Sequence, residues 1–293
     1  MPALRGFRMG RVKVSERTLE LWDEFVSPFL PKDNFLYKPY TDYTFKGVDR
    51  GKEIVDLFGY IKIPVKGKIV LDLGLGAGGI SIAFSMSGSR VVGIDIEKYY
   101  PRIAQSWARD NKVEVDPLLA SGTHLPFRDS SFHIVVCNDV IEHVNNAEKC
   151  SEEISRVLKN RGKLYITCPN RIAPLIVARD GHYGLPLQSL MPKKLADAYV
   201  RAARRAVHDN VPYQPTFTGL VERFRKLGIT LYSVELSLKL KSFFDSKDNS
   251  VLSKVKRAIA KVFPGLVEIY SRHFFLKWFT CLLYTSPSPR DRG

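Results

Sequence analysis

The chain alternates short, continuous apolar runs with segments in which apolar residues recur every three or four positions. The runs are rich in Val, Ile and Leu, as in strands that are buried on both faces of a parallel sheet. They lie at 66–74, 89–97, 132–139 and 163–169, with a shorter one near 113–119. The segments with helical spacing between them are 80–88, 99–110 and 146–159. This order predicts an α/β fold with a doubly wound, mainly parallel sheet of seven strands and helices on both faces.

Further elements are expected on both sides of this core. Near the start, the spacing of Leu19, Trp22, Phe25 and Val26 predicts a short amphipathic helix, which a stretch rich in proline and aromatic residues follows. We interpret residues 1–50 as a helical collar. The pattern also predicts helices at 52–60, 216–228 and 251–263, the last of them basic, and strands at 229–239 and 272–283.

Residues 171–215 interrupt the alternation of strands and helices. Because ligands of open α/β sheets bind beyond the carboxyl ends of the strands, we expect this insertion to form a cap over that cleft. His182 and Tyr183 near its start could contact a ligand or simply support the cap. The last residues, 284–293, are rich in Ser, Pro and Arg, and we interpret them as a non-native or disordered tail without function.

A glycine-rich turn connects the first apolar run to the next helix. Gly74, Gly76 and Gly79 fit the pattern G-x-G-x-x-G of dinucleotide-binding folds, so a nicotinamide dehydrogenase is one interpretation. Asp72 precedes these glycines, where a carboxylate repels a pyrophosphate but suits a ligand with an ammonium group. Asp95 ends the second run, where a carboxylate can accept hydrogen bonds from both hydroxyls of a ribose. Asp72 therefore favours S-adenosylmethionine, which has an amino group and a sulfonium and lacks phosphate, whereas Asp95 suits the ribose of either ligand.

Four segments together resemble the class I S-adenosylmethionine-dependent methyltransferases, within the broad group of small-molecule and quinone-biosynthesis enzymes. They are LDLGLGAGG (71–79), VVGIDIE (91–97), LPFRDSSFHIVVCNDVIEHV (125–144) and EEISRVLKNRGKLYITCPNR (152–171). Their order and spacing match the family over about residues 68–171. The resemblance implies a Rossmann-like methyltransferase domain, which we place at 51–283, and S-adenosylmethionine as its cofactor.

The resemblance also implies which residues hold the cofactor. In the family pattern, Gly74, Gly76 and Gly78 let the backbone approach the methionine part, and Asp95 holds the ribose. We add Ile96, the next residue, to the predicted cofactor contacts.

On the adenine side this sequence departs from the family. An aspartate often precedes L-P-F by a few residues there and bonds the adenine amino group, whereas Ser121 stands in that position here. Its hydroxyl could accept the same bond, or a backbone group of Gly122 or Thr123 could do so. Asn138 completes the predicted cofactor contacts. The usual S-F-D of the family is S-F-H here, and we expect His133 to be only a surface histidine.

Asp139, Glu142 and His143 follow a predicted strand at the ligand end of the sheet. An imidazole near neutral pH can take a proton from an acceptor hydroxyl or amine, so His143, with Asp139, is predicted to be catalytic. Alternatively, Glu142 and His143 shape the loop by local packing. A third option is a divalent ion held by D-x-x-E-H, as in the E-x-x-E-H of some quinone-pathway relatives, although we predict no metal. Methyl transfer from a sulfonium depends chiefly on positioning.

The formal charge of +15 favours an anionic partner such as nucleic acid, a lipid surface or an acidic substrate. An RNA methyltransferase is therefore an alternative, but no N-P-P-Y or D-P-P-Y tetrapeptide follows the fourth strand to clamp a flipped base. Two basic amphipathic helices could rest on an anionic bilayer or pack on the core. In the first helix, the basic face is Arg201, Arg205 and His208, and the apolar face is Leu195, Tyr199, Ala202 and Ala206. In the second, the basic face is Lys254, Arg257 and Lys261, and the apolar face is Leu252, Val255, Ile259 and Val262.

The four cysteines lie far apart and lack the paired spacing of a zinc site, which indicates reduced thiols. No segment has the pattern of a signal peptide or a membrane span. We therefore expect a cytoplasmic methyltransferase of a small or lipid-like molecule, with peripheral contact to an anionic membrane as an option and nucleic acid not expected as a partner. A degenerate protein that binds the cofactor without turnover is a further alternative.

Overall fold

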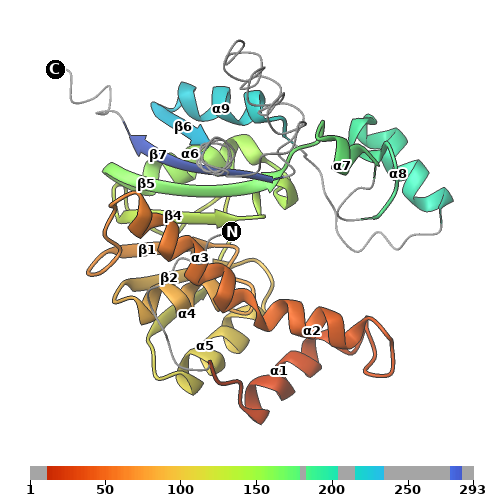
Figure 1. Ribbon diagram of the computed structural model, residues 1–293, viewed down its shortest axis with the longest axis horizontal. Coiled ribbons are helices and arrows are strands. Elements are labelled where there is room, and N and C mark those ends of the chain that lie inside the picture. Colours follow the sequence, from red (N-terminus) through yellow and green to blue (C-terminus); the bar gives the residue numbers. More distant parts are fainter. Residues whose placement is uncertain (1–11, 179–182, 204–214, 234–277, 286–293) are drawn as a thin grey trace, which may run out of the picture. The chain divides into compact units, whose positions relative to one another are not determined.

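The computed structural model describes residues 12–178, 183–203, 215–233 and 278–285 (Figure 1). Its seven-stranded sheet has the strand order β3-β2-β1-β4-β5-β7-β6. The strands are β1 (Ile69–Leu73), β2 (Arg90–Asp95), β3 (Val115–Leu119), β4 (Phe132–Asn138), β5 (Leu158–Pro169), β6 (Ile229–Ser233) and β7 (Trp278–Thr285). β2 is parallel to both β1 and β3, whereas β7 is antiparallel to β5 and β6. The predicted α/β fold with a seven-stranded sheet is thus confirmed.

The helices follow the predicted periodicity closely. They are α1 (Glu16–Val26), α2 (Tyr37–Phe45), α3 (Gly47–Tyr60), α4 (Gly79–Met86), α5 (Tyr100–Asp110), α6 (Ala147–Val157), α7 (Pro174–Ala178), α8 (Lys193–Ala202) and α9 (Phe217–Lys226). Two short 3-10 turns are η1 (Ile141–His143) and η2 (Gln188–Leu190). Among these, α2 was not predicted as a separate helix. The predicted helix at 251–263 and residues 286–293 of the predicted tail lie outside the described residues. The first two residues of that tail, 284 and 285, are instead the end of strand β7.

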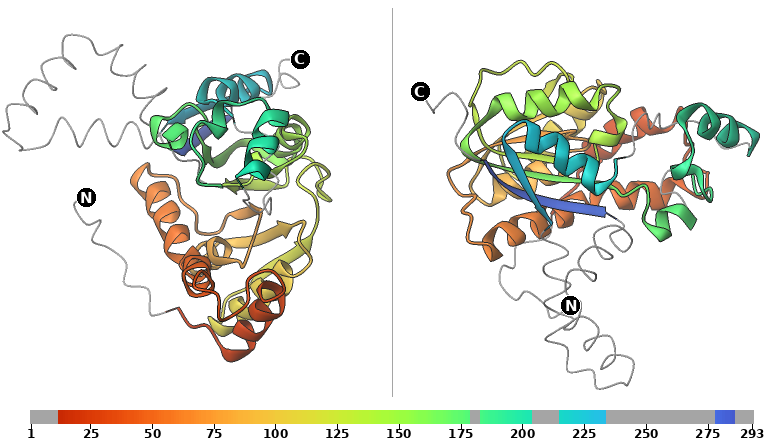
Figure 2. Two further views of the ribbon diagram at one scale, coloured as in Figure 1. Left: turned by 90° about the vertical axis from the view of Figure 1, so that its right-hand side faces the viewer. Right: turned by 90° about the horizontal axis from the view of Figure 1, so that it is seen from above.

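The chain divides into two units, Met1–Val136 with Arg156–Gly162 and Cys137–Ser155 with Lys163–Gly293. In the first unit, α1 packs against α5 (Figure 2). Ser15 caps α1 by accepting the Thr18 N–H, and the Thr18 hydroxyl lies 2.7 Å from the Asp110 carboxylate of α5. Trp22 and Trp107 are completely buried between these elements. The predicted collar is therefore part of the hydrophobic core of this unit.

Helices α3 and α4 touch at the level of their backbones. A Cβ atom added to Gly79 would lie 2.4 Å from the carbonyl carbon of Gly47, and one added to Gly51 would lie 2.6 Å from the Cβ of Ala83. Such distances exclude any side chain at Gly79 without a shift of the backbone. Because Gly79 is the first residue of α4, this contact fixes the start of the helix directly after the glycine turn.

In the second unit, α9 begins at its cap Thr216, whose hydroxyl accepts the Gly219 N–H at 3.1 Å. Helix α9 then leads into β6, which pairs with β7. Parts of the predicted cap also belong to this unit, namely α7, η2 and α8.

The predicted apolar face of α8 is wrong by one position. Leu195 is 61% exposed, whereas Ala196 and Val200 are buried. These two residues are four positions apart, so they form the inner stripe of the helix and turn Leu195 outward. His182, Arg205, Ala206 and His208 lie outside the described residues. Among the helices that the structure describes, none has the length and apolar character needed to span a membrane.

Candidate cofactor and active site

The glycine turn between β1 and α4 adopts backbone angles that favour glycine. Gly74, Gly76 and Gly78 have φ values of 79°, 53° and 94°, all in the left-handed region. A Cβ atom on Gly78 would lie 2.7 Å from the Cβ of Ala104, whereas one on Gly76 would meet no atom within 4 Å. The space beside Gly76 is therefore open, and a ligand can approach the backbone there.

Asp72 lies in β1, directly before this turn, and is only 2% exposed. The Ser81 hydroxyl of α4 donates a hydrogen bond of 2.6 Å to its Oδ2. Burial raises the pKa of Asp72 to about 7 although the bond from Ser81 lowers it, and the nearby charge of Asp95 raises it further. A cationic group beside Asp72 would relieve this penalty, because opposite charge favours the ionised carboxylate.

Asp95 is the last residue of β2, and its carboxylate is tied to the backbone on both sides. Its Oδ2 accepts the N–H of Gly76 at 2.8 Å, and its Oδ1 accepts the N–H of Glu97 at 2.9 Å. Burial raises its pKa, while these backbone bonds lower it. Since a carboxylate has about four acceptor positions, two remain for the hydroxyls of a ribose. Ile96 beside it is 76% exposed and offers an apolar surface to a ligand.

The residues predicted for the adenine side form one turn after β3. Ser121 Oγ lies 2.9 Å from Thr123 Oγ1 and accepts the Thr123 N–H at 3.3 Å. Thr123 Oγ1 in turn lies 3.0 Å from His124 Nδ1. The backbone of Ala120 donates to the Asp95 carbonyl at 2.9 Å, which ties this turn to the end of β2. The register of the parallel strands places the ends of β1, β2 and β3 at one edge of the sheet.

These residues suit S-adenosylmethionine. The buried carboxylate of Asp72 favours a cationic amino group, and Asp95 retains acceptor positions for a diol. Gly76 lies between these two residues in the sequence. The space beside it is open, and its N–H donates a hydrogen bond to Asp95. A pyrophosphate at the glycine turn would instead meet the carboxylate of Asp72, which repels it, whereas Asp95 could serve the ribose of either ligand.

Asn138 and Asp139 belong to the second unit, where they share a polar network with Thr167 of β5. Asp139 has a φ of 56°, which is uncommon for a residue other than glycine. Its N–H donates to both the carbonyl and the hydroxyl oxygen of Thr167, at 3.1 and 3.0 Å. The Thr167 hydroxyl lies 2.9 Å from Asp139 Oδ1 and 3.1 Å from Asn138 Oδ1. Thr167 therefore fixes both predicted residues, and the sequence analysis missed it.

Glu142 and His143 point in different directions from η1. Glu142 is 0% exposed, and neither of its carboxylate oxygens has a hydrogen-bond partner among the described residues. Burial, and next the charge of Asp139, raises its pKa to about 8. His143 is exposed. The described residues contain no group of three His, Cys, Asp or Glu side chains that could hold a metal ion.

His133 is more than the surface histidine that the sequence suggested. It is half-buried, and its Nδ1 accepts the N–H of Ile69 at 3.1 Å, where β1 begins. Its Nε2 lies 3.3 Å from the Lys159 ammonium group. Burial, helped by the charge of Lys159, lowers its pKa and keeps the ring neutral as an acceptor.

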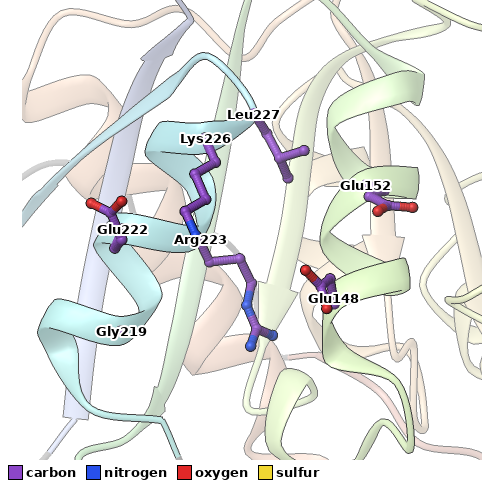
Figure 3. Close-up of a pocket in the computed structure, with 7 residues that line it drawn as sticks. All are labelled: Glu148, Glu152, Gly219, Glu222, Arg223, Lys226 and Leu227. Carbon is purple, nitrogen blue, oxygen red and sulfur yellow. The ribbon is translucent and has the colours of Figure 1, made fainter.

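A groove of about 600 Å³, open to solvent, lies between α6 and α9. Figure 3 shows the Arg223 side chain extending into the space between the two helices, with Glu148 on the opposite side. Its lining residues are Glu148, Glu152, Gly219, Glu222, Arg223, Lys226 and Leu227. None of the predicted site residues is among them, so the groove adds nothing to the predicted site.

Residues 71–166 match the family model described as a methyltransferase domain. The chain is 32% identical over 108 residues to a ubiquinone biosynthesis O-methyltransferase of Pelagibacter ubique, covering 37% of this chain and 45% of that protein. It is 34% identical over 130 residues to a demethylmenaquinone methyltransferase of Clavibacter sepedonicus, covering 44% and 51%. The chain thus spans about half the length of these curated relatives.

One solved structure extends the likeness to the fold of nearly the whole chain. It is an S-adenosylmethionine-dependent methyltransferase from Mesorhizobium loti, with a TM-score of 0.53 and 17% identity, covering 81% of this chain and 99% of that one. Residues 71–166 thus match a methyltransferase domain, and the fold of the chain resembles that of this solved methyltransferase. Neither the matched family model nor this solved structure supports the alternative interpretation of the glycine pattern, a nicotinamide dehydrogenase.

Proposed function

We propose that the protein transfers a methyl group from S-adenosylmethionine to a small or lipid-like molecule. The observation that carries this proposal is the pair of carboxylates at the glycine turn. Asp72 is buried, with a pKa raised to about 7, and Asp95 is bonded to the Gly76 N–H. Such a pair favours a ligand that is cationic at one end and bears a sugar diol at the other.

Each predicted cofactor residue then has a defined task. Asp72 holds the amino group, and the backbone at Gly74, Gly76 and Gly78 accommodates the methionine part. Asp95 accepts the hydrogen bonds of the ribose, as its two remaining acceptor positions allow.

On the other side of the sugar, Ile96 covers the adenine ring, while Ser121, Gly122 and Thr123 bond its edge. The hydroxyls of Ser121 and Thr123 are bonded to each other, and each keeps acceptor capacity for the adenine amino group. Asn138, fixed by Thr167, completes the set.

Bound S-adenosylmethionine supplies a methyl group on a sulfonium, which departs as a neutral thioether when the acceptor attacks in line. The protein must therefore align the acceptor, exclude water and accept its proton. His143 takes that proton, since its imidazole is exposed and a neutral imidazole can act as a general base. Asp139 supports the site from its rigid position against Thr167.

The acceptor is small or lipid-like. Two relatives are named for ubiquinone biosynthesis and for demethylmenaquinone, and both names refer to lipid-soluble quinones. In the cap region, Leu187, Leu190 and Leu195 are exposed next to Lys193 and Lys194. Apolar and basic side chains together suit the surface of an anionic membrane, so we place the protein in the cytoplasm with peripheral membrane contact.

Binding of S-adenosylhomocysteine, the demethylated cofactor, tests the proposal. Calorimetry should show binding to the wild-type protein, and Asp95→Ala should weaken it by about 1 to 3 kcal/mol through the lost ribose bonds. The matched control is Asp116→Ala, because Asp116 is exposed on the neighbouring strand β3. Equal affinities of Asp95→Ala and wild type would remove Asp95 from the site. Absence of binding to the wild type would overturn the proposal.

A further inference from the structure

One arginine holds the segment that follows the predicted adenine turn, residues 121–124. Arg156 lies in the last turn of α6, and its guanidinium donates to the carbonyl oxygens of Phe127 and Leu125, at 2.7 and 3.0 Å. Its Nη1 also donates to Asp129 Oδ1 at 2.9 Å. The Arg156 carbonyl in turn accepts the N–H of Ser130 at 2.9 Å. The side chain and the backbone of one residue therefore both bind the chain between residues 125 and 130.

The bonds to the carbonyl oxygens matter more here than the ion pair. The side chain of Asp129 is 62% exposed, and an ion pair open to water contributes little. Leu125, by contrast, is only 5% exposed, and the ring of Phe127 packs edge-on against that of Phe132, with 4.9 Å between the centroids. Because a guanidinium presents its N–H groups in a rigid plane, it holds the two carbonyl groups at fixed places.

The adenine turn is fixed at its other end as well. The N–H of Ala120 donates to the carbonyl of Asp95 at 2.9 Å, and the N–H of His124 closes the turn by donating to the carbonyl of Ser121 at 3.1 Å. Leu125, which Arg156 holds, is the next residue of the chain. The four residues of the turn thus lie between two anchors. A loop that is held in its binding conformation loses less entropy when a ligand binds.

We propose that Arg156 is a positioning residue for the adenine of the cofactor. By holding the carbonyls of Leu125 and Phe127, it keeps the turn that carries Ser121 and Thr123 in the place where the adenine edge binds. This inference rests on the proposed function, because it concerns the same bound cofactor. It goes further by giving a role in cofactor affinity to a residue that acts through the turn and not by contact with the ligand.

A ligand without adenine separates positioning from general stability. Arg156→Gln should weaken binding of S-adenosylhomocysteine about threefold to tenfold, because the turn then loses one of its two anchors. The same variant and the wild type should bind S-ribosylhomocysteine, which has the amino acid and the sugar without the adenine, with equal affinity in calorimetry. An equal loss of affinity for both ligands would overturn the proposal, since the effect would then not concern the adenine.

Two further variants separate the carbonyl bonds from the charge, including the case in which Arg156→Gln does not fold. Arg156→Lys retains the charge and can still pair with Asp129. One ammonium group cannot replace the guanidinium at both carbonyls, so affinity for S-adenosylhomocysteine should fall here too. Wild-type affinity in this variant would overturn the proposal. Asp129→Ala removes the ion pair and keeps both carbonyl bonds, so it should bind like the wild type, and a loss of affinity there would count against the carbonyl bonds.

The matched control is Arg90→Gln on β2. The side chain of Arg90 is 76% exposed and lies 3.8 Å from the Asp116 carboxylate, so the variant should bind both ligands like the wild type. If Asp95→Ala weakens binding of S-adenosylhomocysteine and Arg156→Gln does not, this inference fails while the proposed function stands. If the wild type does not bind S-adenosylhomocysteine, the proposed function fails with it.

Discussion

The substitution Asp72→Asn separates what the buried carboxylate does for stability from what it does for binding. The pKa of Asp72 is raised from 3.8 to about 7 in the folded protein. Folding therefore favours the protonated form, and the contribution of this group to stability is complete below about pH 4. It is lost progressively as the pH rises to about 7. A rise of about 3 units corresponds to roughly 4 kcal/mol lost above pH 7.

Asparagine has nearly the same shape but no charge, and its amide oxygen can still accept the hydrogen bond from Ser81. At pH 8, the free Asp72→Asn protein should therefore be more stable than the wild type, by up to about 4 kcal/mol. At pH 4 the two should be nearly equal. Urea unfolding at several pH values measures this difference. Asp116→Asn is the matched control, because Asp116 is exposed and should show no such trend.

The same variant should bind S-adenosylhomocysteine more than about tenfold more weakly, because an amide cannot pair with an ammonium group. In the wild type, affinity should fall as the pH drops below about 7, because the amino group favours the ionised carboxylate. A variant that is less stable than the wild type at pH 8 would refute the reasoning about the buried charge. A pH-independent affinity would refute the assignment of the amino group to Asp72.

Three further changes test other parts of the account. Glu142→Gln should stabilise the protein at pH 9 and leave its stability unchanged at pH 4, because the pKa of Glu142 is raised from 4.5 to about 8. A variant that urea unfolds more easily than the wild type at pH 9 would contradict this prediction. Gly79→Ala should lower the free energy of unfolding by at least about 2 kcal/mol, since the new Cβ would lie 2.4 Å from the backbone of Gly47. The control Gly59→Ala, whose Cβ would have no atom within 4 Å, should leave thermal unfolding nearly unchanged. His143→Ala should reduce methyl transfer with little change in cofactor affinity, and unchanged turnover would make His143 structural.

Much of the fold could be predicted because its strands are continuous apolar runs. The runs that became β1, β2 and β4 are buried along most of their length, which makes them distinct from the helices between them. By contrast, α2 has no buried residue, so it leaves no periodic signal. Strand β5 begins at Leu158, earlier than the predicted start at Lys163. The chain stays in the strand through Arg161, although the φ angle of Arg161 is 58° and lies in the left-handed region.

The candidate site was predicted where the chemistry follows from one short segment. Asp72 and Asp95 could be assigned because the strand ends and the glycine turn fix their places. Thr167 could not, since its role depends on contacts with residues remote in the sequence. A threonine within the apolar run of β5 was the available signal for Thr167. The pattern D-x-x-E-H did not indicate that Glu142 would be buried and His143 exposed. These residues are neighbours in the short helix η1, and the direction of that helix turn determines which side chain faces the interior.

The boundaries of the collar at 1–50, the methyltransferase domain at 51–283 and the cap at 171–215 stay predictions. The residues assigned to cofactor and acceptor likewise stay predictions. The fold and the matched residues 71–166 indicate a methyltransferase domain, which limits the ligands worth testing.

The most direct test compares two ligands at the glycine turn. Calorimetry at pH 8 should show that the wild-type protein binds S-adenosylhomocysteine and does not bind NAD, and that Asp95→Ala weakens the former. Binding of NAD in preference to S-adenosylhomocysteine would contradict the account, because a pyrophosphate would then occupy the place assigned to an amino acid.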